Sequence, residues 1–465
     1  AGHRGITSAG ALLDALDRAR LFELAQLPFD LEELLLIWKD TGTLESRLTV
    51  LEHGIRRRLV QPPDAPAALT FDRAVEGARR LALAATLTGD SNICLPGRAG
   101  GGLDAAAILA DWSEEEIRQL LARGVFSEAI YAMVRFRHRE VRELLAAQLL
   151  EDALQKPGKR ADVEALLFKK MYGEQVIVPR LRPLLPWLIL SDETIRLRAL
   201  SLKPEIATEG GDPSRLPLEV RRSVLRDIVG RMVDDDDRGG DNSAIARIAQ
   251  ADLADEARTL IELHGDNDDV IFFLGRLVWQ GAMAKVAGLL EPIARDPARG
   301  IYARIVSARA VATVLGGTAA HDLWKSLNAS GEILPQRLVA ELAEYAPPDT
   351  TTVELLLRSL DMVEPRDEHG VNGLAQAMHD LIDRMPLTND RAPDQPLLRL
   401  VEGLSDFLAR EPYVERRECR ISKTFQWLMG PAMHAVERLI AGRAEACFGA
   451  PAIRILGHVP VLRHW

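Results

Sequence analysis

Residues 135–149 read Arg135-Phe136-Arg137-His138-Arg139-Glu140-Val141-Arg142-Glu143-Leu144-Leu145-Ala146-Ala147-Gln148-Leu149, and the fold prediction starts from them. The segment from Ile130 to Phe136 mixes β-branched and aromatic side chains, as a short strand does. From Val141 onward, leucines recur at the spacing of one helix face. The sequence therefore predicts a strand that runs directly into a helix, with His138 at the junction.

A winged-helix-like unit is predicted around this junction, over residues 66–155. Helices are expected at 71–87, 104–110 and 113–123, and Ser113 with Glu116 three positions later forms a capping-box pattern. Residues 125–136 then resemble a small hairpin, the wing of such a unit. His138 by itself is better explained as a residue that caps or packs the junction, because one histidine does not make a site.

Winged helices often bind DNA, so DNA binding is an alternative that the arginines of this region keep open. Glutamates alternate with these arginines, and Arg139 lies four residues before Glu143, which predicts an ion pair on one helix face. The arginines concerned are Arg118, Arg123, Arg135, Arg137, Arg139 and Arg142.

The preceding residues, 1–65, are predicted to form a small helical domain. Apolar side chains form an amphipathic stripe over 9–26, a second helix begins near Asp30 and ends at Gly42, and a third is expected over 44–59. The chain begins Ala1-Gly2-His3-Arg4, without an initiator methionine or a leader pattern. We therefore expect a piece of a longer polypeptide, or a trimmed one.

After residue 156 the pattern is helix after helix, and no strand is predicted beyond Asp162. Paired helices about every 40 residues predict HEAT-like repeats over 156–346 and further, irregular helical repeats over 347–465. Segments 194–200 and 302–316 resemble HEAT helices in particular, with alanines at the contacts between helices and arginines on the outer edge. The predicted helices are 192–202, 214–232, 243–264, 268–280, 282–295, 298–315, 353–362, 374–384, 397–408, 421–429 and 432–441.

Bulk properties limit the class of protein. A chain of 465 residues exceeds one ordinary core, so several domains or a long repeat array are expected. A net charge of −10 argues against a general nucleic-acid or membrane-surface binder, although it allows a local basic patch. No apolar run approaches the ~20 residues that cross a bilayer. Three widely separated cysteines form no metal or redox pair, which fits a reducing, cytoplasmic setting.

No self-sufficient active site is predicted, and we assign no catalytic residue and no metal ligand. The glycine-rich segment 97–102 lacks the Gly-Lys-Ser/Thr ending of a phosphate loop. The acidic run 234–242 places arginine or glycine where a calcium loop needs oxygen ligands. Nucleophile-elbow, His-Glu-x-x-His and Cys-x-x-Cys patterns do not occur in the sequence.

Two segments resemble one known family. The pattern Phe136-x-His138-x-x-Val141-x-Glu143-x-Leu145-Ala146-Ala147 closely resembles the Phe-x-His-x-Ser-Phe-Gln-Glu-Phe-Leu-Ala-Ala stretch of NACHT-type STAND NTPases. This family includes animal NOD-like receptors and bacterial antiphage STAND proteins. Residues 24–31, which contain Pro28, resemble the Leu-Ala-x-x-Pro-x-x-Leu segment that opens the small helical domain of the family. The resemblance covers residues 10–150, in the same order and at similar separation.

The resemblance implies a regulatory role. In the family an upstream P-loop domain binds ATP or ADP, the proline contacts adenine, and the winged-helix histidine reaches the phosphates in the closed, ADP-bound form. Pro28 and His138 thus become candidate nucleotide contacts. Glu140, Val141 and Arg142 depart from the family serine, phenylalanine and glutamine.

No Walker A lysine or Walker B acidic run occurs in the sequence, so this chain alone is not expected to be an enzyme or to hold a cofactor. ATP or ADP would bind only in a longer parent, whose NTPase domain is the expected partner. The resemblance further implies that the helical repeats bind a protein ligand and that activation involves an oligomer. Two alternatives remain: a free-standing α-solenoid scaffold that binds proteins without nucleotide, and a winged-helix DNA-binding regulator.

Overall fold

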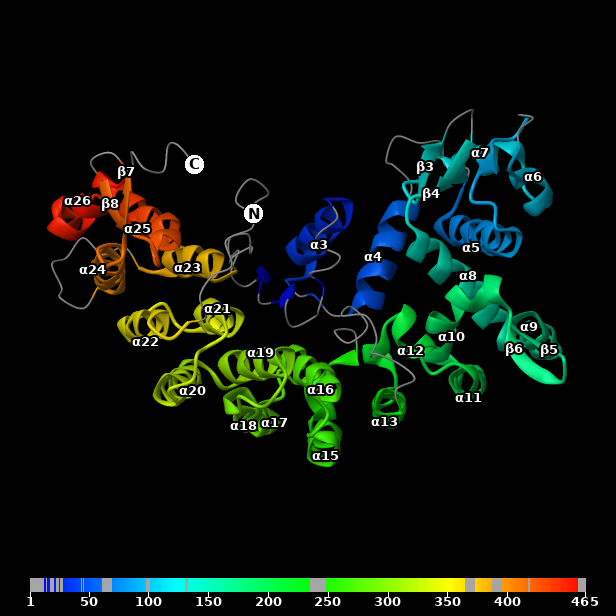
Figure 1. Ribbon diagram of the computed structural model, residues 1–465. Helices are drawn as coiled ribbons and strands as arrows, with labels where there is room; N and C mark the ends of the chain where they lie inside the picture. The colour runs from blue at the N-terminus through cyan, green and yellow to red at the C-terminus, as the bar shows by residue number, and fades with distance from the viewer. Residues whose placement is uncertain are drawn as a thin grey trace. The chain divides into compact units, whose positions relative to one another are not determined.

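The computed structural model describes residues 12–13, 15–16, 21, 25, 28–42, 44, 46–60, 69–97, 101–129, 133–234, 248–363, 373–386, 395–416 and 419–458 (Figure 1). For residues 28–30, 33, 129, 415–416 and 419 it describes the backbone alone. Most of the described residues are helical, and small β-sheets lie between the helices. The prediction of a mostly helical chain with small β elements is therefore confirmed.

Contacts between residues divide the chain into two compact units. Unit 1 comprises residues 1–228 and 240–248, and unit 2 comprises residues 229–239 and 249–465. Among the described helices, none is long and apolar enough to cross a membrane.

Unit 1 begins with a small helical core. Helix α3 (Pro28–Thr41) ends at Gly42, whose φ of 68° is the left-handed conformation that glycine adopts easily, so the predicted stop is confirmed. Helix α4 (Arg47–Leu59) starts three residues later than predicted, because the Ser46 hydroxyl accepts from the Thr49 amide and fixes the first turn there. Leu34, Ile37 and Val50 bury their side chains in a shared cluster.

The next part of unit 1 contains the junction at His138. The elements are α5 (Phe71–Thr88), β1 (Ile93–Cys94), β2 (Leu103–Asp104), α6 (Ala105–Ile108), α7 (Glu114–Leu121), β3 (Phe126–Ala129), β4 (Met133–Phe136) and α8 (Arg139–Leu154). The strands form one sheet in the order β2-β1-β4-β3, in which β3 and β4 are the predicted antiparallel hairpin. Strands β1 and β2 were not predicted, because two residues are too few for an alternating pattern.

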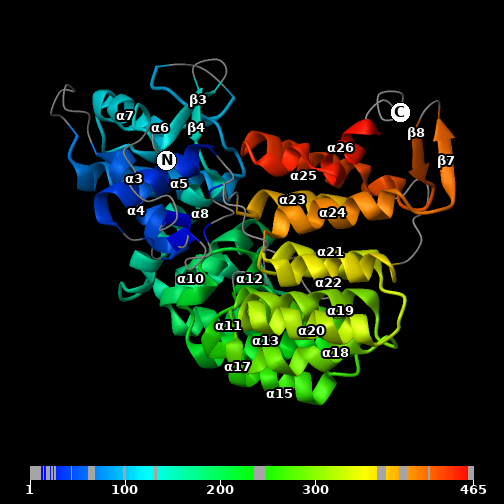
Figure 2. The same ribbon diagram turned by 90° about the vertical axis from the view of Figure 1, so that its left-hand side faces the viewer.

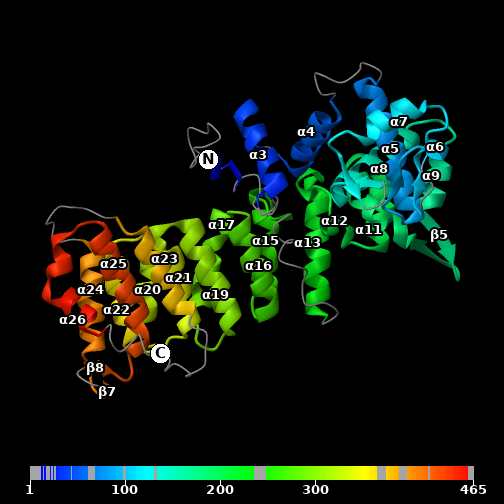
Figure 3. The same ribbon diagram turned by 90° about the horizontal axis from the view of Figure 1, so that it is seen from above.

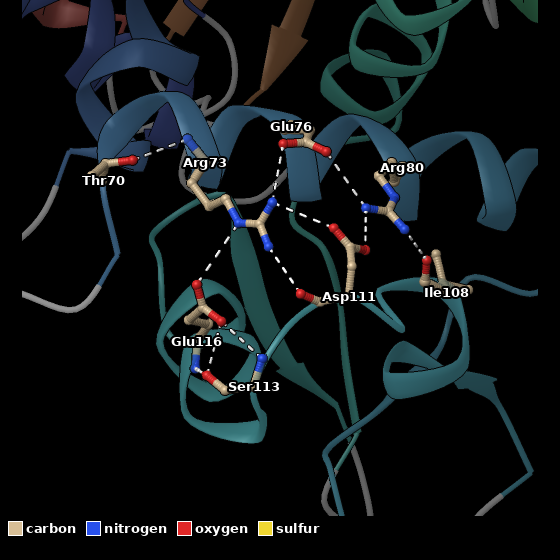
Figure 4. A network of polar contacts seen from close by, with 8 residues as sticks. All are labelled: Thr70, Arg73, Glu76, Arg80, Ile108, Asp111, Ser113 and Glu116. Atoms are coloured by element: carbon tan, nitrogen blue, oxygen red, sulfur yellow. Dashed lines mark hydrogen bonds and ion pairs between the residues drawn. The ribbon is translucent and has the colours of Figure 1, made fainter.

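Polar contacts fix α5 to the segment between α6 and α7 (Figure 4). The predicted capping box is confirmed, since Ser113 and Glu116 exchange hydrogen bonds between side chain and backbone. Arg80 of α5 donates to the Asp111 carboxylate at 2.7 Å and to the Ile108 carbonyl at 2.7 Å. Arg73 reaches toward Asp111 and Glu116, and its guanidinium lies 4.4 Å from the Trp112 ring centre. The start of α7 is thereby held against α5.

The prediction that no strand follows Asp162 is wrong. Strands β5 (Phe168–Met171) and β6 (Glu174–Ile177) form an antiparallel hairpin after α9 (Arg160–Leu167). Tyr172 and Gly173 make its turn with φ values of 51° and 91°. The rest of unit 1 is helical: η2 (Pro179–Leu184), α10 (Leu185–Ser191), α11 (Glu193–Leu202), α12 (Ile206–Glu209), η3 (Pro213–Arg215) and the first part of α13 (Leu218–Val233).

Unit 2 contains two rows of neighbouring helices. Its elements up to residue 360 are η4 (Ala251–Leu253), α15 (Ala254–His264), α16 (Asp268–Gln280), α17 (Ala284–Ala287), η5 (Gly288–Leu290), α18 (Glu291–Arg295), α19 (Ile301–Ala310), η6 (Val311–Leu315), α20 (Gly317–Ala329), α21 (Gln336–Tyr345) and α22 (Thr350–Leu360). Then follow α23 (Gly373–Arg384), α24 (Pro396–Leu408), β7 (Tyr413–Arg416), β8 (Cys419–Ser422), η7 (Gln426–Leu428), α25 (Met429–Ala441), η8 (Glu445–Phe448) and α26 (Ala450–Gly457).

One row is α16, α19, α21, α23 and α25, each packed against the next, and the other is α18, α20, α22, α24 and α26. Figure 2 shows the two rows from α18 and α19 onward. Figure 3 shows the same succession of α19, α21, α23 and α25 from another direction. A continuous apolar core lies between the rows, and the fully buried Trp324 belongs to it.

Several helix predictions in this part are corrected. The helix expected over 421–429 is wrong, because this range holds the end of strand β8, a turn and the short 3-10 helix η7, and α25 begins only at Met429. The helix expected over 282–295 is broken into α17, η5 and α18, and Pro292, which lacks an amide hydrogen, lies in the first turn of α18. The helix expected over 243–264 begins at Ala254, while residues 243–247 lie outside the described part.

The sequence predicts that the arginines of segment 302–316 lie on an outer edge of the repeats, and this prediction is wrong. Arg304 is only 3% exposed and donates to both carboxylate oxygens of Glu332, at 2.6 and 3.0 Å. Arg309 is half-buried and pairs with the buried Glu341. Helical periodicity places a residue on a face, but it does not say which neighbour covers that face.

Candidate functional site

His138 lies where the sequence placed it, between β4 and α8. Phe136 is the last residue of β4, and His138 is the extended residue that precedes the first turn of the 16-residue helix α8, with φ −126° and ψ 137°. Its side chain makes no capping hydrogen bond to the helix and is half-buried. The imidazole therefore stands at the positive end of a long helix without serving as its cap.

Arg137 holds the end of β4 in place. Its amide donates to the Val125 carbonyl at 2.9 Å, and its guanidinium donates to the carbonyls of Gly124 and Phe126 at 3.2 and 3.1 Å. The Gly124 amide in turn donates to the Arg58 carbonyl at 3.1 Å, near the end of α4. The residue before His138 is thus fixed by backbone groups of two segments.

The start of α4 is tied to the first turn of α8. Arg47 donates from Nη2 to both carboxylate oxygens of Glu140 at 2.8 Å, and from Nε to one of them at 3.3 Å. Such a bidentate, partly buried pair has a defined geometry. Glu140 therefore links the start of α4 to the first turn of α8.

Glu143 lies one turn further along α8 and is 8% exposed. Burial raises the pKa of its carboxyl, and the hydrogen bond that Arg139 donates at 2.5 Å opposes this shift. The same bond raises the pKa of the Arg139 guanidinium. The ion pair predicted from the four-residue spacing is confirmed, and it neutralises one of the arginines near His138.

Arg142 is the second arginine in the first turn of α8, and it differs from Arg139 in its lack of an ion pair within the described residues. It lies four residues after His138, so both side chains occupy one face of the junction. Its Nε is buried without a hydrogen-bond partner, and no ion pair of its guanidinium is found within the described residues. An imidazole, a guanidinium and a helix N-terminus are groups that together suit an anionic oxygen ligand.

The inner face of α8 fixes this turn relative to α5. Val141, Leu144, Leu145 and Leu150 are buried, and α8 packs along α5. Arg79 of α5 donates to the Gln148 side chain at 3.1 Å and to the Asp152 carboxylate at 3.0 Å. Valine at position 141 is thus accommodated in the core, although the family has phenylalanine there.

Pro28, the other predicted nucleotide contact, is the first residue of α3. Its side chain lies outside the described part of the structure. Helix α3 packs against α4, whose Arg47 reaches Glu140. The backbone of Pro28 and the junction at His138 therefore belong to elements that are connected through α4.

Two residues of this site were missed from the sequence. The sequence pattern indicated Arg142 as a candidate DNA contact and as a departure from the family glutamine, but not as a neighbour of His138, although an arginine four residues after the histidine was itself a signal. Arg47 carried no signal, because its partner lies 93 positions away.

No cluster of three or more histidine, cysteine or acidic side chains suited to a metal ion is found within the residues that the structure describes. No family model, curated protein or solved structure is detectably similar to this chain.

Proposed function

We propose that this chain is the regulatory and sensor portion of a NACHT-type STAND signalling NTPase. Residues 1–65 would be its small helical domain, residues 66–155 a winged-helix domain that controls the nucleotide-bound off state, and the helices from residue 156 onward a sensor for a protein trigger. ATP or ADP would bind in a P-loop domain of the longer parent. Bacterial antiphage defence is the biological setting that the resemblance suggests.

The observation that carries this proposal is the arrangement around His138. Helix α5, strand β1, helices α6 and α7, and the β3–β4 hairpin follow one another in the order of a winged helix, and β1 pairs with β4. His138 then stands at the N-terminus of α8, four residues before Arg142. This geometry supports a contact to a phosphate group that an adjoining domain presents.

Unit 2 supports the second half of the proposal. Its two rows of successively packed helices, which run from α16 to α26, are what a HEAT-like α-solenoid would present. Arrays of this kind expose extended surfaces that bind other proteins. The trigger would bind here, and binding would shift the equilibrium away from the closed state.

The first test is the reading frame upstream of residue 1. It should encode a strand followed by Gly-x-x-x-x-Gly-Lys-Ser/Thr, because the phosphates need a P-loop that residues 1–465 do not contain. A parent protein without that motif would contradict the proposal.

The second test measures how long the purified parent retains ADP. His138→Leu removes the imidazole donor and Arg142→Gln installs the family residue, and each should accelerate ADP release by roughly tenfold, about 1.4 kcal/mol. The matched controls are His264→Leu, a half-buried histidine of unit 2, and Arg135→Gln, an exposed arginine of β4. ADP release that is unchanged in both test variants, or equally fast in the controls, would remove the role given to this turn.

A protein-binding scaffold without nucleotide is the second candidate, and the same two rows of helices favour it. A native reading frame that begins near residue 1 would support this candidate over the first.

DNA binding is disfavoured by the ion pairs of the winged-helix-like region. Arg118 pairs with Glu114 at 2.7 Å, and Arg139 pairs with Glu143. These carboxylates neutralise arginines that phosphate contacts would require. Residues 60–155 should accordingly show no salt-dependent binding to duplex DNA.

A further inference from the structure

Unit 2 presents a set of aromatic and arginine side chains on three neighbouring helices. We call it the aromatic–arginine face, and it consists of Phe272 and Trp279 on α16, Tyr302 and Arg309 on α19, and Arg337 and Tyr345 on α21. These helices are consecutive members of one row, with α19 packed against both α16 and α21 (Figure 3). The six side chains form two chains of ring contacts that run across the row.

The first chain of contacts is exposed. Phe272 and Tyr302 are 36% and 56% exposed, and their ring centres lie 6.1 Å apart in an edge-to-face arrangement. The Arg337 guanidinium lies 5.3 Å from the Tyr302 ring centre and donates to its hydroxyl at 3.1 Å. Three side chains from three helices are thus ordered against one another although solvent reaches them.

The second chain of contacts is half-buried. The Arg309 guanidinium lies 4.4 Å from the Trp279 ring and 5.3 Å from the Tyr345 ring, and it pairs with the buried Glu341. Burial raises the pKa of Tyr345 to about 12, with Arg309 opposing the shift. The ion pair and the two rings hold each other in one conformation.

The distance between the two chains of contacts is set by the positions of their residues along α16 and α19. Phe272 and Trp279 are seven residues apart, as are Tyr302 and Arg309. Seven residues are about two helical turns, or roughly 10.5 Å, so the side chains of each pair point from the same face. Ile305 and Ala340, both half-exposed, lie on α19 and α21 between them. The face is therefore broad enough to hold several consecutive residues of a partner.

The composition of this face is unlike that of the chain. Aromatic residues are 5% of the sequence, yet they are four of these six side chains. Tyrosine, tryptophan and arginine are the residues that carry most binding energy in protein interfaces, because they bury large areas at small entropic cost. Ordered, partly exposed rings of this kind favour a protein partner.

The charges of the face indicate the chemistry of that partner. Within the described residues Arg337 has no carboxylate partner and donates only to a neutral hydroxyl, whereas the charge of Arg309 is already balanced by Glu341. This exposed cation occurs on a chain with a net charge of −10. A carboxylate would complete the hydrogen bonds of the guanidinium, and apolar side chains would cover the rings.

We propose that the aromatic–arginine face binds a protein segment in which acidic residues alternate with aromatic or aliphatic ones. Carboxylates of the segment pair with Arg337, and its apolar side chains pack on Phe272, Tyr302 and Ile305. In the proposed function, these residues form the surface that binds the trigger. Only this role as a trigger sensor rests on the proposed function. Binding by this face requires neither nucleotide nor an upstream domain.

The test uses the complete 465-residue chain. Random 12-residue peptides displayed on phage are selected on it and depleted on the variant Tyr302→Ala/Arg337→Ala, whose altered side chains are exposed and so dispensable for folding. Enriched peptides, labelled with fluorescein, are titrated by anisotropy, with circular dichroism as the check of folding. The matched control is Phe448→Ala/Arg454→Ala, an exposed aromatic and an exposed arginine elsewhere in unit 2.

The enriched peptides should be rich in Asp or Glu together with aromatic or leucine residues. Their affinity should fall at least about tenfold in Tyr302→Ala/Arg337→Ala, stay within about twofold in the control, and weaken in high salt. Failure to enrich any peptide, enrichment of basic peptides, or equal affinity for the double variant would overturn the proposal. A fluorescein-labelled dT20 that binds with the same dependence on Tyr302 and Arg337 would assign the face to nucleic acid instead.

The result of the peptide-binding experiment can be distinguished from the result of the ADP-release experiment. Peptide binding that fails while His138→Leu accelerates ADP release would overturn this proposal alone. Unchanged ADP release with specific peptide binding would leave the aromatic–arginine face in place and remove the nucleotide-contact role given to His138 and Arg142.

Discussion

The ion pair between Arg304 and Glu332 shows how much a single buried charge depends on its partner. The Arg304 guanidinium, 3% exposed, donates to both Glu332 oxygens and also to the Ala294 carbonyl at 3.2 Å. These bonds compensate a charge that water cannot reach. Removing one member of a buried pair leaves the other charged and desolvated, which costs more than the pair contributes.

Glu332→Gln should therefore destabilise the protein by about 3 kcal/mol, because the charge on Arg304 loses its counter-ion in the core. Chemical denaturation followed by circular dichroism measures this change. The matched control is Asp322→Asn, which removes the partner of Lys325 from an ion pair whose side chains are 57% and 61% exposed. That substitution should cost under about 1 kcal/mol, and equal costs for both variants would refute the argument from burial.

Helix α5 shows the same dependence on neighbours at the scale of an element. A Cβ at Gly77 would lie 2.5 Å from Trp112 and 2.7 Å from Leu120, so α5 approaches α7 and the preceding turn only because this residue has no side chain. Gly230 in α13 is the contrasting case, since a Cβ there would meet no heavy atom within 4 Å.

Gly77→Ala should destabilise unit 1 by about 1–3 kcal/mol through overpacking. Gly230→Ala should instead stabilise the protein by about 0.5–1 kcal/mol, because alanine loses less backbone freedom in a helix than glycine does. Thermal or chemical denaturation of both variants gives the comparison. A gain in stability from Gly77→Ala would show that the close packing of α5 is not required.

The hairpin of β5 and β6 explains one failure of the sequence prediction. Its two-residue turn needs positive φ at both positions, which asparagine or glycine normally provides. Here Tyr172 occupies the first position with φ 51° and a fully exposed ring. Only Gly173, at the second position, is a residue that indicates such a turn in the sequence. The two consecutive lysines, Lys169 and Lys170, also interrupt the alternation of apolar and polar residues that predicts a strand.

At the scale of the molecule, each unit has a core of its own. The buried cluster that contains Trp324 and Leu342 lies entirely in unit 2, and α5 packs along α8 in unit 1. Compact parts with separate cores lose stability separately when one core is damaged.

Hydrogen exchange measured by mass spectrometry should locate the effect of each substitution. Gly77→Ala should increase exchange in residues 69–228 and leave 249–458 unchanged, whereas Glu332→Gln should do the reverse. A rise in exchange across both ranges in either variant would mean that the units unfold as one.

The sequence by itself determined the helical class, the β3–β4 hairpin, the junction at His138, the capping box of Ser113 and Glu116, and the pair of Arg139 with Glu143. Each of these depends on residues within about a dozen positions of one another, where hydrophobic period, capping and spacing act directly. The strands of two residues and the hairpin with tyrosine in its turn lacked such local signals.

Only the tertiary structure decided which distant side chains meet. Arg47 reaches Glu140 across 93 positions, Arg304 is buried against Glu332, and the rings of three helices come together around Tyr302 and Arg309. The seven-residue spacing of aromatic residues and arginines was present in the sequence, but it is shared by many buried faces. Exposure depends on what packs against a face, and packing is a property of the whole fold.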